Sequence, residues 1–244
     1  MAAILETLAQ DRFEPLAGPI AAREALNVSA VLPLRISDYD ALYQRPDLQG
    51  RKLWLPDRDI VRLCDDKLKM NDFLRAKSFT AIVPEHSTQS LGVYPVIVKK
   101  VHDENGENSF VAFDKAEEEA IIRKFAGGAF FVQRFVTGRD EYAVHVLAVE
   151  GEAYFVKAIR HVMAGDHCVK GARNIPERSE ATRLPKGGEI IFDILRILRY
   201  TGVCCVNLKG SERDMKLLEI NPRFGYSLCR HINEFLDAYI DSFA

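Results

Sequence analysis

Three oxygen-bearing side chains near the C-terminal end of the sequence have the types and spacing of a metal site. Glu219 and Asn221 lie two residues apart in a stretch with the pattern of a β-strand, so both side chains point to the same face. Asn207 lies on the predicted partner strand of a hairpin, which can bring its oxygen alongside them. Mg²⁺ prefers hard oxygen ligands and usually completes its shell with water and nucleotide phosphates. One carboxylate and two amides therefore suit a metal shared with a nucleotide better than a dedicated metal cage.

The elements that must hold these side chains follow an α+β pattern. The hairpin is predicted over residues 204–221, and the apolar residues of 187–200 recur with the spacing of an amphipathic helix. Before them, residues 141–161 predict two strands around a tight turn with the sequence VEGEA. The alternative to a metal site in the hairpin is a strand face that is polar because it is exposed.

A smaller α+β unit is predicted in the middle of the chain. Its expected elements are strands over 78–85, 94–100, 109–113 and 129–136, a polar loop before the third strand and an acidic helix over 114–126. Strands and a helix in this order form a small lobe in which the helix covers one face of a sheet.

Residues 1–66 are predicted to form a small α/β unit. The expected elements are a helix near the start, a strand over 27–34, a helix over 38–48 and a strand over 51–56. From Arg58 to about Ala76 the apolar residues recur at helical spacing, with Asp57 as the cap. This unit is half of a domain of nucleotide-binding size.

Charge and cysteine content exclude several classes of function. The 244 residues contain 33 Lys and Arg against 35 Asp and Glu, so no overall basic field draws the chain to nucleic acid or to an anionic membrane. The five cysteines include no CxxC pair, which argues against a disulfide framework and a cysteine zinc site. The start lacks a basic n-region, and no apolar run is long enough to span a membrane. We expect a cytoplasmic chain without nucleic-acid or membrane partners.

Four ordered motifs give the sequence a resemblance to a known family. They are TGVCCVN with LLEINPR (201–207 and 217–223), YPVIVKK (94–100), FVQRFVTGRDEY (131–142) and DDKLKMNDFL (65–74). In that order they resemble the terminal metal-binding strands, the phosphate-lysine strand, the adenine hinge and the Asp-Lys entry helix of the ATP-grasp superfamily. Carboxylate–amine ligases such as D-alanine ligase, and carbamoyl-phosphate synthase, belong to this superfamily.

The resemblance implies an α+β ATP-grasp fold with a shortened N-terminal α/β domain. Residues 1–66 would form that domain, 67–138 the small lobe with the phosphate-covering loop, and 139–244 the large lobe with the metal and substrate sites. The implied cofactors are ATP and Mg²⁺, with Mn²⁺ as a substitute. Because the first domain of the family normally helps to hold the acceptor, its shortness implies one of two arrangements. Either a partner chain or a second subunit of a homo-oligomer completes the acceptor site, or that side is open to solvent.

The same resemblance implies roles for individual residues. Lys67 and Lys99 would bind the nucleotide phosphates, with Lys100 the alternative to Lys99. Glu141 would accept from the ribose hydroxyls, with Asp140 the nearest competitor. The other implied nucleotide contacts are Gln133, Arg134, Phe135 and Val136 around adenine and Ser109 over the phosphates. The implied metal ligands are Asn207, Glu219 and Asn221, with Asn207 in place of a more usual acidic residue.

Cations are the candidates on the substrate side. Arg160 and Arg223 are natural clamps for an acyl phosphate and its precursor, because arginine binds carboxylate and phosphate through two parallel hydrogen bonds. Lys157 and Arg173 are further candidates, with cations that merely flank a sheet as the alternative for both. His161 and His167 fit no common metal-ligand spacing and are interpreted as ordinary surface or loop histidines.

The implied function is that of a ligase that uses ATP to activate a small-molecule carboxylate as an acyl phosphate, which an amine then attacks. Two alternatives keep the nucleotide site. One is a small-molecule kinase that stops at phosphorylation. The other is a nucleotide-binding module without turnover, favoured by Asn207, by the shortened first domain and by a phosphate-covering loop in which Gly106 is the sole glycine of residues 102–109.

Overall fold

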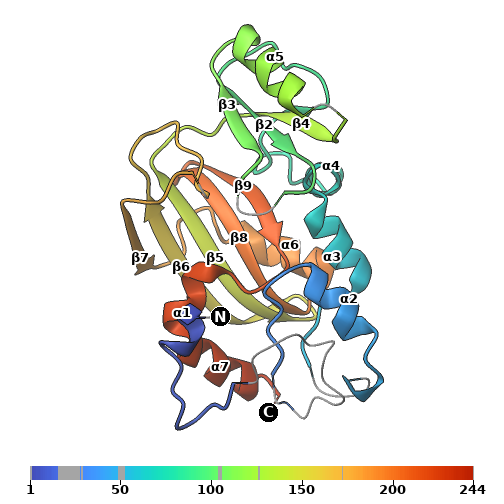
Figure 1. The fold of residues 1–244 in the computed structure, drawn as a ribbon, viewed down its shortest axis with the longest axis vertical. Helices are drawn as coiled ribbons and strands as arrows, with labels where there is room; N and C mark the ends of the chain where they lie inside the picture. Colours follow the sequence, from blue (N-terminus) through green and yellow to red (C-terminus); the bar gives the residue numbers. More distant parts are fainter. Residues whose placement is uncertain are drawn as a thin grey trace.

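A five-stranded antiparallel sheet forms the base of the large lobe (Figure 1). The structure is a computed structural model that describes residues 2–15, 28, 30–48, 53–103, 106–125, 127–171 and 173–243. In order across the sheet, the strands are β7 (Arg178–Thr182), β6 (Glu152–Val162), β5 (Asp140–Val149), β8 (Gly202–Ser211) and β9 (Asp214–Asn221). The predicted hairpins over 141–161 and 204–221 are confirmed as β5–β6 and β8–β9. Glu150 and Gly151, both with positive φ, make the tight turn between β5 and β6.

Alternate residues of β5, β6 and β8 serve opposite faces of this sheet. Even-numbered residues such as Val144 and Val206 pack on helix α6 (Ile190–Leu198), which confirms the amphipathic helix predicted over 187–200. Odd-numbered residues such as Leu147 and Val203 pack on α7 (Ile232–Asp241) and on the 3₁₀ helix η3 (Tyr226–His231). Other odd-numbered residues line a cavity that faces the small lobe.

The small lobe is a four-stranded antiparallel sheet with helix α5 against it (Figure 1). The strands are, in order, β1 (His86–Ser87), β4 (Phe130–Arg134), β2 (Val96–Lys100) and β3 (Ser109–Ala112). Helix α5 (Lys115–Lys124) begins after Asp114, whose carboxylate accepts from the backbone N of Glu117 at 2.8 Å. Ile121 of α5 packs with Val96 and Val98. The strands predicted over 94–100, 109–113 and 129–136 and the acidic helix are confirmed.

The strand predicted over residues 78–85 is wrong, because these residues form turns and the short β1 follows them. Ile82 and Val83 are buried in the same core as α6, so their side chains pack in the large lobe without strand pairing. The backbone N of Leu217 donates to the O of Ile82 at 2.9 Å and ties this turn to β9. A buried turn and a buried strand have the same apolar composition, which is why the pattern misled.

The N-terminal segment packs on the large lobe and contains short helices. They are α1 (Ala2–Leu5), α2 (Ser37–Tyr43) and the 3₁₀ helix η2 (Pro46–Leu48). The strands predicted over 27–34 and 51–56 are not formed by the described residues of these stretches. Residues 27, 29, 51 and 52 lie outside the described part of the chain. Leu34 and Trp54 instead pack against the core of α7 and η3, so the apolar runs cover the large lobe. The α+β class of the whole chain is confirmed.

The helix predicted over 58–76 is divided into α3 (Arg58–Asp65) and α4 (Lys67–Ala76). Asp57 caps α3 as predicted, by accepting from a backbone N–H of its first turn at 2.8 Å. Asp66 is extended and caps α4, with its carboxylate 2.9 Å from the backbone N of Lys69. The break makes Lys67 the first residue of α4, beside the β8–β9 hairpin.

All five cysteines are free. Within the described residues, no helix combines the length and the apolar character that crossing a membrane would require.

Gly210, near the end of β8, offers a test of how rigid the β8–β9 hairpin is. Its φ is 130°, and a Cβ added there would lie 2.3 Å from the backbone O of Asp214. Gly138 has a φ of 133° but no atom within 4 Å of an added Cβ. We expect Gly210→Ala to lower the free energy of unfolding by more than about 3 kcal/mol, and Gly138→Ala by about 1–2 kcal/mol from backbone strain alone. Urea unfolding measures both, and equal losses would show that the hairpin yields to the added atom.

Candidate functional site

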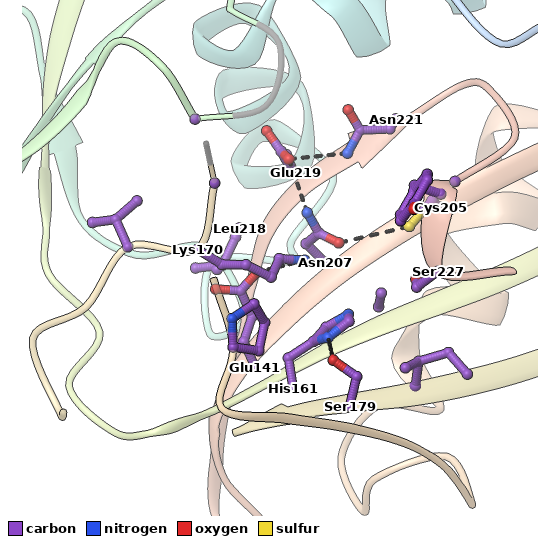
Figure 2. Close-up of a pocket in the computed structure, with 18 of the residues that line it drawn as sticks. Glu141, His161, Lys170, Ser179, Cys205, Asn207, Leu218, Glu219, Asn221 and Ser227 are labelled. Atoms are coloured by element: carbon purple, nitrogen blue, oxygen red, sulfur yellow. Dashed lines mark hydrogen bonds and ion pairs between the residues drawn. The ribbon is translucent and has the colours of Figure 1, made fainter. Parts of the chain in front are cut away.

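A cavity of about 1040 Å³ lies between the two lobes. Strands β2, β3 and β4 supply residues on the small-lobe side, and β5, β6, β8 and β9 supply those on the large-lobe side. Residues of the loop between β6 and β7, and of η3, form further walls. Figure 2 shows the part of the cavity over the large sheet. Its volume lies at the upper end of the range for small-molecule sites, which leaves room for a second substrate beside a nucleotide.

Glu219 holds the centre of the predicted metal set. It lies opposite Asn207 in the β8–β9 register, next to an irregularity after Asn207. The Nδ2 atoms of Asn207 and Asn221 both donate to its Oε1, each at 2.9 Å (Figure 2). Burial raises the pKa of Glu219, but the charge of Lys67, the bond from Asn221 and the charge of Lys99 lower it to about 2. The structure therefore brings the three predicted ligands together around an ionised carboxylate.

This set fits Mg²⁺ in the kind of atoms that it offers. A carboxylate and two amides supply hard oxygen atoms and one negative charge, so phosphates and water would complete the shell. The thiol of Cys205 donates to Oδ1 of Asn207 at a Sγ–O distance of 3.6 Å. Among the described residues, no group of three or more His, Cys, Asp or Glu side chains could hold a metal. The candidate metal site therefore rests on Glu219 and its two amide neighbours.

The two predicted phosphate lysines line the cavity from the side of the small lobe and α4. Nζ of Lys67 lies 3.6 Å from Oε2 of Glu219 and donates to the backbone O of Asp103. Nζ of Lys99 donates to Oε1 of Gln133 at 2.9 Å. Burial lowers the pKa of Lys99 to about 8, against the opposing effect of Glu219. Lys100 does not line the cavity, because its Nζ lies over the ring of Phe125, so the structure favours Lys99.

Two further lysines of the cavity were missed in the sequence. Lys170, in the β6–β7 loop, lies 3.0 Å from Oε1 of Glu141 (Figure 2). Burial lowers the pKa of Lys170, but the charge of Glu141 and smaller contributions outweigh burial, so the pKa is raised overall. Lys209 is buried, and burial lowers its pKa. Lys209 lies two residues after Asn207 on the same strand, so strand alternation could have found it, whereas no local signal marks Lys170.

These side chains form one electrostatic cluster with an excess of positive charge. The charges of neighbouring members act on the pKa values of Lys99, Lys170, Lys209 and Glu219. The members are Lys67, Lys99, Lys170, Lys209, Glu141 and Glu219. Four lysines face two glutamates, so the cluster carries two more positive than negative charges. Burying cations without matching anions is unfavourable, which agrees with the lowered pKa of Lys99 and Lys209. A polyanion such as a triphosphate fits this cluster.

The predicted hinge residues also reach the cavity. Gln133 is buried, and its Nε2 has no hydrogen-bond partner among the described residues, so it can donate to a ligand. The ring of Phe135 stacks on His167 with centroids 5.8 Å apart, and Nζ of Lys209 lies 4.9 Å from its centre. Val136 and the exposed Arg134 line the same region.

The choice between Glu141 and Asp140 follows from strand alternation. Glu141 is buried and lines the cavity, whereas Asp140 does not line it. Asp140 instead accepts from Nη2 of Arg160 at 2.7 Å. The structure therefore favours Glu141 as the group that a ribose would meet.

In the predicted phosphate-covering loop, Ser109 is buried and lines the cavity. Asn108 is bound to Asp103, with its Nδ2 2.8 Å from Oδ1 of that residue. Gly106 has a φ of 64°, and a Cβ there would lie 2.8 Å from the backbone O of Lys170. Residues 104 and 105 of this loop lie outside the described residues. The described part of the loop thus touches the β6–β7 loop of the large lobe.

Of the predicted substrate cations, Arg223 lines the cavity and the others do not. The prediction for Arg160 is corrected, because this even-numbered residue lies on the face of the sheet that packs on α6, bound to Asp140 and Glu180. Lys157 is likewise corrected. It is odd-numbered, but its Nζ lies 2.6 Å from Oε2 of Glu234 on α7.

Arg173 also lies outside the cavity lining. Its Nη2 donates to the backbone O of Ser109 at 2.8 Å, and its guanidinium lies 3.9 Å from the ring centre of Phe110. Both contacts are with β3, so Arg173 connects the loop of the large lobe to the small lobe.

His161 is buried and lines the cavity, which corrects its interpretation as a surface or loop histidine. Its Nδ1 lies 2.8 Å from Oγ of Ser179, and Nε2 of the buried His145 lies 2.8 Å from Oγ of Ser227. Burial, followed by the charge of Lys170, lowers the pKa of His161 to about 4 and that of His145 to about 3. Both rings are therefore neutral at neutral pH.

Comparison with known proteins agrees with this geometry. The family described as the ATP-grasp domain matches residues 64–227. D-alanine–D-alanine ligase from Bacillus anthracis, complexed with ATP, has a similar structure, with a TM-score of 0.63 and 13% identity over 98% of this chain and 89% of that one. An L-amino acid ligase from Bacillus licheniformis has a TM-score of 0.53 and 18% identity over 71% of this chain and 44% of that one.

A third similar structure is N5-carboxyaminoimidazole synthase from Aspergillus clavatus, in complex with ADP, with a TM-score of 0.55 and 15% identity over 85% of this chain and 58% of that one. No curated protein matches the chain. At such identities the structural likeness establishes the fold alone. This chain spans less than half the length of the L-amino acid ligase.

Asn207→Asp should make the stability of the protein depend on Mg²⁺. The substitution would place a second carboxylate where an amide N now lies 2.9 Å from Oε1 of Glu219. Two carboxylates at this distance repel each other unless a proton or a cation lies between them. We expect a lower melting temperature in EDTA and its recovery in Mg²⁺, with a much smaller response in the native protein. Asn221→Asp, at the same distance from the same oxygen, should behave alike. Destabilisation that Mg²⁺ leaves unchanged would argue against a metal at this position.

Nucleotide affinity should fall as the pH rises through about 8, the pKa of Lys99. Below this pH the lysine is charged in the free protein and can pair with a phosphate. Above it the lysine is neutral, so binding must take up a proton. Calorimetry of ATP with Mg²⁺ in two buffers of different ionisation enthalpy should reveal this uptake near pH 8. Lys99→Arg stays charged throughout and should abolish it. Equal uptake by both proteins would assign the titration to another group.

Proposed function

Since the chain belongs to the ATP-grasp family, we propose that it is an ATP- and Mg²⁺-dependent ligase that joins a carboxylate to an amine. The γ-phosphoryl group of ATP passes to the carboxylate, and the amine then displaces phosphate from the acyl phosphate. The observation that carries this proposal is the cluster of four lysines beside Glu219 and its two amide neighbours. Phosphoryl transfer depends on positioning and charge neutralisation, so this chemistry needs no protein nucleophile.

In this proposal the lysine cluster holds the triphosphate. Lys67 and Lys99 approach from α4 and the small lobe, and Lys170 and Lys209 from the large lobe. Nε2 of Gln133 and the ring of Phe135 are available to the base, while Glu141 is available to the ribose. When bound at Glu219, Mg²⁺ supplies neutralisation of the phosphate oxygens.

Arg223 is the residue that we assign to the transferring group. It follows the metal ligand Asn221 by two residues and lines the same cavity. A guanidinium can bind the substrate carboxylate before transfer and the acyl phosphate after it, because both present paired oxygen atoms. The names of the similar ligases support amino acids and related carboxylates as the substrates to test first.

Transfer of oxygen from the carboxylate to phosphate tests the mechanism directly. ATP turnover is first screened against amino acids and small carboxylic acids, with primary amines as acceptors. With an ¹⁸O-labelled carboxylate, one labelled oxygen should then leave with the phosphate as the amide forms. A stable phosphorylated product that keeps the label would identify a kinase. Binding of ATP without any phosphate release across the panel would identify a binding module, and unlabelled phosphate would exclude the acyl phosphate.

Two arginines provide a matched pair for the same assay. Arg223→Ala should lower kcat by about 10²-fold or more while leaving nucleotide affinity within a few-fold, because the residue meets the transferring group and not the base. Arg160→Ala removes an identical side chain from the opposite face of the sheet, where it is bound to Asp140, and should leave kcat nearly unchanged. The assignment of Arg223 fails if the two variants lose activity equally.

A further inference from the structure

The cavity has a second end, formed by η3 and the residues that follow α1. Thr7, Arg230 and His231 line it. Oγ1 of Thr7 donates to the backbone O of Cys229 at 2.7 Å. The side chain of Asn233 bonds to the backbone at Thr7 and Ala9, at 2.8 and 2.9 Å. Residues after α1, η3 and α7 therefore build this end of the cavity together.

His231 is held at this end by a carboxylate. Its Nδ1 lies 3.1 Å from Oε1 of Glu234, and the other oxygen of Glu234 lies 2.6 Å from Nζ of Lys157. The bond from Lys157, followed by that from His231, lowers the pKa of Glu234, which stays a carboxylate at neutral pH. A carboxylate can only accept hydrogen bonds, so Nδ1 carries the proton and Nε2 of the neutral ring is an acceptor.

The pair of His231 and Glu234 is not explained by helix capping. His231 occupies the N-cap position of α7, but its side chain makes no capping hydrogen bond to the helix. Its ring lines the cavity, and its carboxylate partner is fixed in turn by Lys157 from β6. A lysine of β6 and a glutamate of α7 thus fix the imidazole of His231, with the glutamate in direct contact.

The surroundings of His231 carry little net charge. Besides the pair of Lys157 on β6 and Glu234 on α7, the charged residues that line this end are Arg230 on η3 and Glu6 after α1, which carry opposite charges. Lys157 and Glu234 neutralise each other, so they add little net charge. His231 and Arg223, the residue that we assign to the transferring group, line the same cavity.

We propose that His231 is the general base for the amine substrate, with Glu234 and Lys157 as positioning residues. The proposal rests on the ligase function proposed above, and it places the amine at the η3 end of the cavity. An alkylammonium ion gives one proton to Nε2 of His231 and becomes a neutral amine. The amine nitrogen attacks the acyl carbon, the C–N bond forms, and the C–O bond to phosphate breaks. The second proton of the nitrogen leaves with the phosphate, and His231 returns its proton to solvent.

Hydroxylamine separates the two halves of this reaction, because it is unprotonated at neutral pH and needs no base. The probes are the acid that gives the most ATP-dependent hydroxamate in a panel of amino acids and small carboxylic acids, and the primary alkylamine that the native protein accepts best. In His231→Asn we expect the rate with the alkylamine to fall by about 10²-fold or more, and the rate of hydroxamate formation to stay within about threefold.

Positioning by Glu234 is tested with a charge-removing variant. Glu234→Gln should lower the alkylamine rate and move the pH profile of kcat/KM for the amine, while hydroxamate formation stays constant. Glu152→Gln is the matched control. Glu152 is also bound to a cation, with its Oε1 3.0 Å from Nε of Arg196, and is exposed outside the cavity lining. Its substitution should change neither rate.

Three results would overturn the inference. Equal loss of both rates in His231→Asn would assign His231 a structural role, and an unchanged alkylamine rate would show that it is not the base. An unmoved pH profile in Glu234→Gln would remove the positioning role. Failure of the native protein to form any hydroxamate is a different outcome, because it would contradict the proposed ligase function itself.

Discussion

The negative charge of Glu219 is the interaction on which the arrangement of the cavity depends. Lysines from α4, from the small lobe and from the β6–β7 loop all act on this carboxylate and hold its pKa at about 2. Burying cations is costly unless anions accompany them. Glu219 and Glu141 together offset half of the positive charge of the four lysines. The remainder is available to a ligand, so the residue that we propose as a metal ligand also makes it possible to gather the lysines.

Strand alternation decides which charged residues join this cluster. In β5, β6 and β8 the odd-numbered residues face the cavity or η3 and α7, and the even-numbered ones face α6. This selects Glu141 over the chemically similar Asp140, and it places Arg160 outside the cavity. A shift of one residue in register would exchange the sets, so the hairpin pairings specify the site as strongly as the residue types do.

The hairpins and their polar residues could be predicted because they depend on local patterns. Glu219 and Asn221 share a face by strand geometry alone, and Asn207 follows from the length of the hairpin. Lys170 could not be found in this way, since a loop with no periodic pattern brings it to Glu141. The prediction of strands in the N-terminal segment was wrong for a related reason. Apolar runs such as the one around Leu34 are buried by packing on α7 and η3, and composition does not distinguish this burial from a sheet.

The two ends of the cavity differ in how they are enclosed, and this difference bears on the proposed chemistry. The phosphate end lies between the lobes, where Arg173 binds β3 and Gly106 lies against the backbone of Lys170. The end at His231 is built from η3, α7, β6 and the residues after α1, all on the large-lobe side. An amine can therefore approach this end while both lobes still enclose the phosphates. Such separation matters for an acyl phosphate, because opening the phosphate end to admit the second substrate would also admit water. On this view, the residues after α1 form a wall of the end where we place the amine, because they pack directly on η3.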